Sequence, residues 1–459
     1  MNSLRALGFV TKALVFMGAT LLAVAHSTAR AWSTAEEIRL GRRFELQARA
    51  RVPLVSDVEA LEYVNRIGGQ IVAVLGSQPI PYRFYVTRDG RVNAFAVPGG
   101  VIYVNAGLLL RAESDDEVAG VLGHEIAHIH SHHLARQQEA AQLLNYTALL
   151  GMLLSAVQPA VGAGAVALQA AKQLQYQREF EQEADYQGAR FMREAGFDPR
   201  GMLQFFRKLL EDQRTSPAQA TPYLLSHPLT EVRLSNLESL LREHGWERVP
   251  LRAPSLLLAR VQVRLRTLIE PAGDVVERYK RRAADNPEDA TAQYLLGLAF
   301  LFAGQPDLAA NSFEKARELG LANVEREIGR TWLARREPAK AVDWLRRAVA
   351  LDPQDAVAHY ELAQALRALG NEQAAEDALD QAVRLVPNFE EATQALGTLA
   401  GRRGEEAKGL YYLGRAAYLR GDLEQALRYW ERALPLWPDT SERGMEIREV
   451  VAELRGMRR

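Results

Sequence analysis

A set of small, large apolar and proline residues recurs along the second half of the chain, and its first three copies are 32 and 34 residues apart. The recurring positions are Gly297, Ala309, Phe313 and Ala316; Gly329, Ala341, Leu345, Ala348 and Pro353; Ala363, Ala375, Leu379, Ala382 and Pro387; and Gly414, Ala426, Trp430, Ala433 and Pro438. Small residues let two helices approach closely, large ones fill the groove beside them, and proline ends the second helix. The period therefore predicts helix pairs stacked into an α-solenoid.

This period and these residue types are typical of tetratricopeptide repeats, and we expect them to form a domain over residues 256–459. Residues 256–289 are predicted to be a capping repeat, and residues 390–406 a helix without a partner. Such arrays usually present a concave surface that binds protein partners. The alternative is that the array only supports the domain before it.

The N-terminus has the pattern of a secretory signal. Arg5 and Lys12 accompany an apolar run over residues 13–25, and Ala29 and Ala31 form a small-x-small cleavage site. We interpret residues 1–31 as a cleaved signal peptide, the alternative being an uncleaved anchor. The formal charge of −1 offers no basic field for nucleic acid, so no nucleic-acid partner is expected.

Residues 32–250 contain the sequence HExxH, which is the strongest chemical signal in the chain. His124 and His128 are four residues apart, so on a helix both imidazoles can reach one metal ion. Glu125 lies where its carboxylate can take a proton from a water molecule. Ser114 and Glu117 have capping-box spacing, which predicts where this helix begins. The alternative is a surface helix with two incidental histidines.

A zinc site needs a third protein ligand, and the absence of cysteine restricts it to a carboxylate or an imidazole. Glu181 and Asp185 share a face of a predicted helix. Glu181 is a candidate ligand, and Asp185 is a candidate acceptor for the second N–H of a ligand imidazole. The alternative is an ordinary solvated acidic face. His130, His132 and His133 are explained by a helix C-terminus, where histidine suits the dipole.

The run Gly123–His128, followed by Glu181–Asp185, resembles the HtpX-like and CAAX-prenyl-protease-like zinc peptidases, which are gluzincins. The resemblance spans residues 36–241 and includes Asn93–Gly100, His227-Pro228 and Arg233. Together with a signal peptide and a repeat tail, it resembles periplasmic proteases that act in the assembly of outer-membrane β-barrel proteins. The implied fold is mainly α with a small β-sheet.

The resemblance also implies roles for individual residues. His124, His128 and Glu181 would bind one zinc ion per subunit, and Glu125 would be the general base. The side chains of Asp185 and His133 would contact the ligands. His227 would be either a further ligand in a self-inhibited resting form or a group near the transition-state oxyanion, and Arg233 would support that loop or the oxyanion. One departure is His132, because the family often has arginine there.

Two further segments carry predictions. Residues Val101, Ile102, Tyr103, Val104 and Asn105 are predicted to form a strand, and as an exposed edge this strand could pair with an extended substrate. The alternative is an ordinary strand of a sheet. The apolar residues 148–171, interrupted by Pro159, are interpreted as a loop or hairpin that covers the active site or touches a membrane. The alternatives there are a buried helix pair and a transmembrane span.

The resemblance therefore implies a periplasmic zinc endopeptidase acting in outer-membrane β-barrel assembly and quality control. Its substrates would be polypeptides, chiefly outer-membrane proteins, and its repeats would dock on the assembly machinery. Two other functions stay open. One is a chaperone or adaptor that acts mainly through the repeats. The other is a peptidase with a general extracytoplasmic substrate range.

Overall fold

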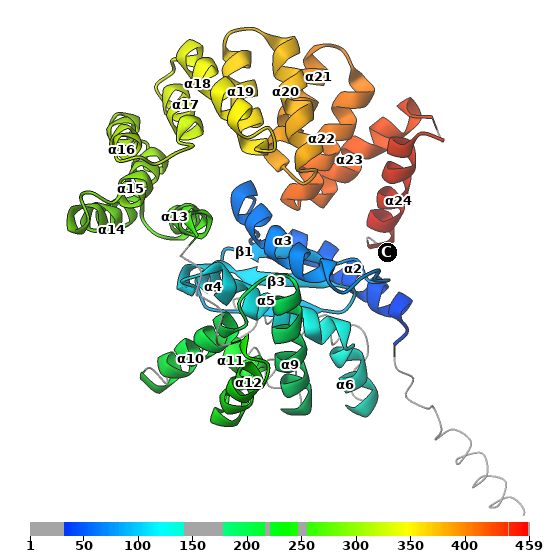
Figure 1. Ribbon diagram of the computed structural model, residues 1–459. Helices are drawn as coiled ribbons and strands as arrows, with labels where there is room; N and C mark the ends of the chain where they lie inside the picture. The colour runs from blue at the N-terminus through cyan, green and yellow to red at the C-terminus, as the bar shows by residue number, and fades with distance from the viewer. Residues whose placement is uncertain (1–31, 142–177, 216–220, 247–254, 439, 458–459) are drawn as a thin grey trace, which may run out of the picture.

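A computed structural model describes residues 32–141, 178–215, 221–246, 255–438 and 440–457, and an N-terminal domain with a small sheet lies beneath an arch of helices (Figure 1). This confirms the predicted fold class, mainly α with one small sheet and a helical array. The predicted signal peptide and the segment 148–171 lie outside the described residues. Within the described ranges, every helix is too short or too polar to cross a lipid bilayer.

The N-terminal domain is mostly helical. Its elements are α2 (Thr34–Arg51), α3 (Val58–Ala73), β1 (Arg83–Thr87), β2 (Ala94–Val97), β3 (Val101–Asn105), α4 (Ala106–Arg111), α5 (Asp115–His130), α6 (His133–Ala141), α9 (Arg178–Glu194), α10 (Arg200–Thr215), α11 (Pro222–Ser226) and α12 (Glu231–Glu243).

The three strands lie in the order β1-β3-β2, so β3 is the central strand. It pairs with β1 in parallel and with β2 in antiparallel register. The interpretation of residues 101–105 as an exposed edge is therefore wrong. Both sides of β3 are occupied by ladder hydrogen bonds, and all five of its residues are buried. The turn at Gly99 and Gly100, both with positive φ, folds β2 back onto β3 and takes up the side that a substrate would need.

Each face of the sheet is covered by helices. Val101 and Tyr103 of β3 pack against α2, where Phe44 contacts the Tyr103 ring edge-on at 5.6 Å. Ile102 and Val104 point to the other face, into the core shared with α3 and α5. This alternation follows from the two-residue period of a strand. It holds the HExxH helix α5 directly against the sheet.

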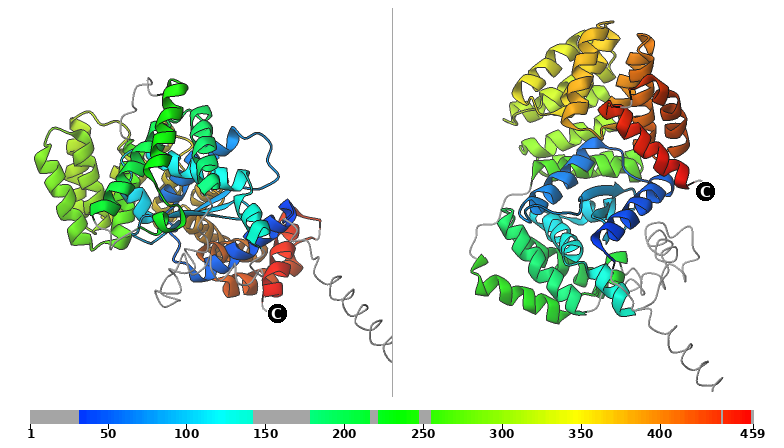
Figure 2. Two further views of the ribbon diagram at one scale, coloured as in Figure 1. Left: turned by 90° about the horizontal axis from the view of Figure 1, so that it is seen from below. Right: turned by 90° about the vertical axis from the view of Figure 1, so that its right-hand side faces the viewer.

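Helix α9 packs on the side of α5 away from the sheet at very short range. A Cβ added at Gly188 would lie 2.9 Å from both Gly123 C and His124 N, so only glycine permits this approach. The approach lines up the N-terminal half of α9, which carries Glu181 and Asp185, with the histidines of α5. The right-hand view of Figure 2 shows these two helices together below the sheet.

The array runs from residue 255 to 457 as paired helices. Its helices are α13 (Leu256–Ile269), α14 (Ala272–Asp285), α15 (Ala290–Phe302), α16 (Pro306–Glu318), α17 (Glu325–Ala334), α18 (Pro338–Leu351), α19 (Ala356–Ala368), α20 (Glu372–Leu385), α21 (Glu390–Arg402), α22 (Glu406–Arg420), α23 (Leu423–Ala433) and α24 (Glu442–Met457).

The recurring small residues do what their spacing predicts. In α15, a Cβ at Gly297 would lie 2.6 Å from the ring of Phe313 in α16, so the small residue makes room for the large one. The prediction that residues 390–406 form an unpartnered helix is wrong. Helix α21 pairs with α22, and Gly397 and Gly409 are the small residues at their contact.

Buried ion pairs join the array to the N-terminal domain. Glu59 at the start of α3 is 2.9 Å from Arg260 of α13 and 2.9 Å from Arg326 of α17, with Arg264 at 3.5 Å. Burial favours a protonated Glu59, but the charges of Arg264, Arg326 and Arg330 outweigh it and hold the pKa of Glu59 below its ordinary value. At the other end of the arch, Arg42 of α2 pairs with Glu453 of α24 at 2.9 Å. These ion pairs thus fix the array to the domain at two places.

Candidate metal centre

The HExxH sequence lies in the buried second half of α5. The helix begins where the sequence predicts, because the Ser114 side chain accepts a hydrogen bond from the Glu117 N–H. His124 and His128 lie one turn apart and are 0% and 2% exposed. An imidazole this deeply buried needs partners for its nitrogen atoms, because an unpaired buried polar group is costly.

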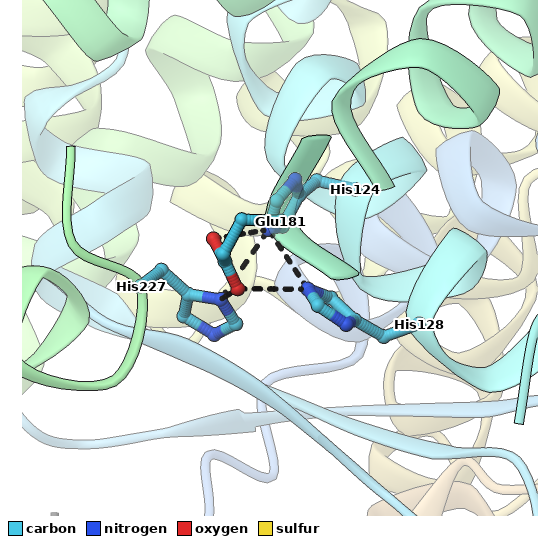
Figure 3. Close-up of side chains that lie close together, drawn as sticks. All are labelled: His124, His128, Glu181 and His227. Atoms are coloured by element: carbon cyan, nitrogen blue, oxygen red, sulfur yellow. Dashed lines mark hydrogen bonds and ion pairs between the residues drawn. The ribbon is translucent and has the colours of Figure 1, made fainter. Parts of the chain in front are cut away.

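Four side chains supply those partners to one another. His124, His128, Glu181 and His227 each offer one donor atom, and these atoms all lie within 4.8 Å of one another (Figure 3). Nε2 of His124 is 3.0 Å from Nε2 of His128 and 3.3 Å from Nδ1 of His227. The Glu181 carboxylate is 3.4 Å from His128, 3.5 Å from His124 and 3.0 Å from His227.

These separations fit a bound divalent metal ion. With metal–ligand bonds of about 2.0–2.1 Å, the ligand atoms of a tetrahedral site lie roughly 3.3–3.4 Å apart. Nitrogen and carboxylate oxygen donors in a buried cluster are also the kind of ligands that zinc takes when cysteine is absent. The four residues are therefore a candidate metal-binding site.

The electrostatics of the cluster favour a cation. Burial would raise the pKa of Glu181, but the charge of His227 and hydrogen bonds from three histidines hold that pKa well below its ordinary value. Burial would lower the pKa of His124, yet its contacts with Asp185 and Glu181 raise it to about 9. The ionised carboxylates thus make this position suitable for a positive charge, which a metal ion supplies when bound.

Arg233 of α12 contacts the cluster from outside it. Its Nε and Nη2 atoms donate to the two oxygens of Asp185, each at 2.8 Å. Its Nη1 atom is 2.6 Å from Glu181 and donates to the Pro228 carbonyl at 2.9 Å. Asp185 in turn lies 2.9 Å from Nδ1 of His124. One guanidinium therefore orients a candidate ligand, the partner of another ligand and the loop that carries His227.

Glu125 is fully buried beside the cluster. Its Oε1 atom is 3.5 Å from Nε2 of His227. Burial raises the pKa of Glu125, although the charges of His227 and His124 act in the opposite direction. A carboxyl whose pKa is raised toward neutral is suited to take up and release a proton.

The structure brings together most of the residues singled out from the sequence. Those that converge are His124, Glu125, His128, Glu181, Asp185, His227 and Arg233, and His133, whose Nδ1 atom lies 2.8 Å from Nδ1 of His128. Val101–Asn105 do not converge, because they form the central strand. Sequence reasoning missed Glu183, which lies 3.2 Å from His133, and Arg136, which pairs with Glu183. Their only signal was the acidic run 179–185.

Comparison with known proteins decides the family. The sequence profile of peptidase family M48 matches residues 60–241, and tetratricopeptide-repeat profiles match residues 276–323, 294–356, 326–388 and 388–440. The M48 match includes all four residues of the buried cluster. Residues 60–241 form an M48 peptidase domain, and tetratricopeptide repeats follow it.

Proteins similar to this chain come from bacteria and mitochondria. A putative β-barrel assembly-enhancing protease of Vibrio cholerae is 33% identical over 298 residues, which are 62% of this chain and 59% of that protein. The β-barrel assembly-enhancing protease of Escherichia coli K12 is 32% identical over 50% of this chain and 49% of its own. The mitochondrial metalloendopeptidase OMA1 of Schizosaccharomyces pombe is 29% identical over 39% of this chain and 53% of its own. The chain spans about half the length of the curated relatives it matches.

Proposed function

We propose that this protein is a zinc-dependent endopeptidase of the periplasm that acts in the assembly and quality control of outer-membrane β-barrel proteins. The observation that carries the peptidase part is the buried cluster of His124, His128 and Glu181 with the carboxylate of Glu125 beside it. The names of the bacterial relatives support the substrate class and the location. The repeats support docking on other proteins, and we propose the β-barrel assembly machinery as their partner.

In this proposal His124, His128 and Glu181 hold the zinc ion. Bound zinc supplies Lewis-acid chemistry, which lowers the pKa of water to about 7 and polarises a carbonyl group. Glu125 accepts a proton from the attacking water and delivers it to the nitrogen of the leaving amine. Asp185 holds His124 through its Nδ1 atom, and Arg233 holds both Asp185 and Glu181. Because β2 is at the edge of the described sheet, we place the extended substrate along β2.

Removing the metal tests the peptidase proposal. After dialysis of the full chain against a chelator, we expect no cleavage of an unfolded protein such as casein. Adding one equivalent of zinc per chain should restore cleavage, because the cluster offers one set of ligands. Metal content and cleavage rate are measured on the same sample. Full activity of metal-free protein would contradict the proposal, and so would a chain that takes up no zinc.

We also propose that His227 keeps the resting site closed. Its Nδ1 atom lies among the candidate ligand atoms, 3.0 Å from Glu181 and 3.3 Å from His124. A catalytic zinc site needs one open position for water, and a fourth protein ligand would fill it. This supports a self-inhibited form over a group that acts only on the transition state. It also favours, as a second function, an adaptor that acts through its repeats while the site is closed.

Replacing His227 with alanine should therefore increase cleavage of an unfolded substrate. If the open form is roughly a tenth of the resting population, the increase is about tenfold. The rate is measured with saturating zinc, and His244→Ala, which changes an exposed histidine at the end of α12, is the control. A fall in kcat for His227→Ala, with zinc still bound, would instead assign His227 to the transition state.

A further inference from the structure

The two histidines of the HExxH helix have different partners for their second ring nitrogen. Nδ1 of His124 lies 2.9 Å from a carboxylate oxygen of Asp185. Nδ1 of His128 lies 2.8 Å from Nδ1 of another imidazole, His133. A carboxylate can only accept a hydrogen bond from a ring N–H, whereas a neutral imidazole nitrogen either donates or accepts. Asp185 therefore selects the tautomer of His124, but His133 alone cannot select the tautomer of His128.

The tautomer of His128 matters because its Nε2 atom faces the cluster. Metal binding requires a bare Nε2, which places the ring proton of His128 on Nδ1. That N–H then donates to Nδ1 of His133, so His133 must carry its own proton on Nε2. Nε2 of His133 lies 3.2 Å from Oε2 of Glu183. The opposite assignment would place a proton on Nε2 of His128, in the way of a metal ion.

The carboxylate of Glu183 resolves this ambiguity, because it can accept the Nε2 proton of His133 and cannot donate one. Nδ1 of His124 and Nε2 of His133 are each within hydrogen-bonding distance of a carboxylate oxygen, of Asp185 and Glu183 respectively. In both contacts the ring N–H does not point straight at that oxygen. Glu183 thus has the same relation to His133 that Asp185 has to His124. Glu183 acts on the ligand His128 through the ring of His133, whereas Asp185 contacts its ligand directly.

Neighbouring side chains hold this arrangement in place. The His133 ring stacks on Phe180 with centroids 4.6 Å apart and an angle of 12° between the planes. Arg136 pairs with Glu183 at 3.1 Å and lies over the same Phe180 ring. His133 is fully buried, whereas the side chains of Glu183 and Arg136 are 36% and 47% exposed. The contacts therefore run from the surface of α9 to the buried His128.

We propose that Glu183 is a positioning residue that acts through His133 to hold His128 in its metal-binding tautomer. The proposal rests on the metal-dependent function described above. Loss of a partner that orients a metal ligand typically weakens metal binding by about 10- to 100-fold. Because Glu183 is partly exposed and acts through His133, we expect its effect at the lower end of that range.

The test measures zinc affinity on the full chain by competition with a chromophoric chelator. Glu183→Ala should weaken zinc binding about tenfold. Glu183→Gln should weaken it less, because the amide oxygen still accepts a hydrogen bond. The matched control is Glu179→Ala, which removes an exposed carboxylate one turn earlier on α9 and should leave the affinity unchanged. Far-ultraviolet circular dichroism checks that each variant is folded.

A double variant separates action through His133 from a direct effect of charge. If Glu183 acts through His133, then Glu183→Ala should have no further effect in a chain that carries His133→Asn. Equal zinc affinity for Glu183→Ala and Glu179→Ala would overturn the proposal, and so would a full tenfold effect of Glu183→Ala in the His133→Asn chain. A wild-type chain that binds no zinc would instead overturn the proposed function. The two failures are therefore distinguishable.

Discussion

Glu125→Gln should reduce cleavage of an unfolded polypeptide by about 10²- to 10⁴-fold and leave zinc bound. Glutamine has nearly the same size as glutamate but cannot accept a proton, so only the general-base step is lost. The donor atoms of the cluster come from other residues and are unchanged. Cleavage rate and zinc content are measured together on the purified full chain.

The same variant can identify what the protein acts on. An inactive enzyme that still binds its substrates should accumulate them, so crosslinking in cells followed by purification of Glu125→Gln should recover outer-membrane proteins. Glu117→Gln, another buried glutamate of α5 placed away from the cluster, is the control for a change of charge in this helix. Undiminished cleavage by Glu125→Gln would end the peptidase proposal. Recovery of cytosolic proteins alone would end the proposed location.

Arg233→Ala should have the largest effect on stability. The change removes a guanidinium that is 5% exposed and leaves the carboxylates of Asp185 and Glu181 buried without it. Breaking a buried ion pair from one side typically costs about 3–5 kcal/mol in the free energy of unfolding. Zinc affinity should also fall, since both carboxylates lose the group that orients them. Urea unfolding of the zinc-loaded chain and chelator competition provide the two measurements.

Two further variants serve as controls for this prediction. Arg233→Lys keeps the charge but cannot donate to both oxygens of Asp185 and to Glu181 at once, so it should recover stability only in part. Arg207→Ala removes an exposed arginine of α10 that pairs with Glu238, and such a surface pair is worth about 1 kcal/mol or less. If Arg233→Ala were no more destabilising than Arg207→Ala, Arg233 would not be needed to hold the site.

The parts of the structure that were predictable from sequence are those set by local periodicity. The spacing of His124 and His128 on one helical face and the Ser114 cap are properties of a single helix. The array follows from a repeat in which each helix pair contacts its neighbours in sequence. Helices α21 and α22 carry the same small and large pair, Gly397 against Leu413, but α22 also carries Gly414 of the last recurring set. From sequence, α22 therefore has the pattern of the first helix of that set and not of a partner for α21.

The parts that were not predictable depend on contacts between segments distant in sequence. Whether a strand lies at the centre or the edge of a sheet is decided by its neighbours, and Val101–Asn105 has the same alternation in either position. Glu183 is two residues from Glu181 and by helical geometry faces another direction. It reaches His133 because His132 has φ +52°, which turns α6 away from the axis of α5. The local sequence does not predict the turn at His132.

The burial of Glu59 has a consequence for any attempt to divide the molecule. Its arginine partners Arg260, Arg264 and Arg326 all belong to the repeats, while the acid itself belongs to the helix that packs beside α5. A protein cut at residue 250 would keep the acid and lose every one of those cations. The Glu59 carboxyl would then have to take up a proton or become hydrated, on a face of the domain that the repeats cover in the full chain. The activity of a truncated peptidase domain would therefore reflect the loss of these ion pairs as well as the properties of the active site.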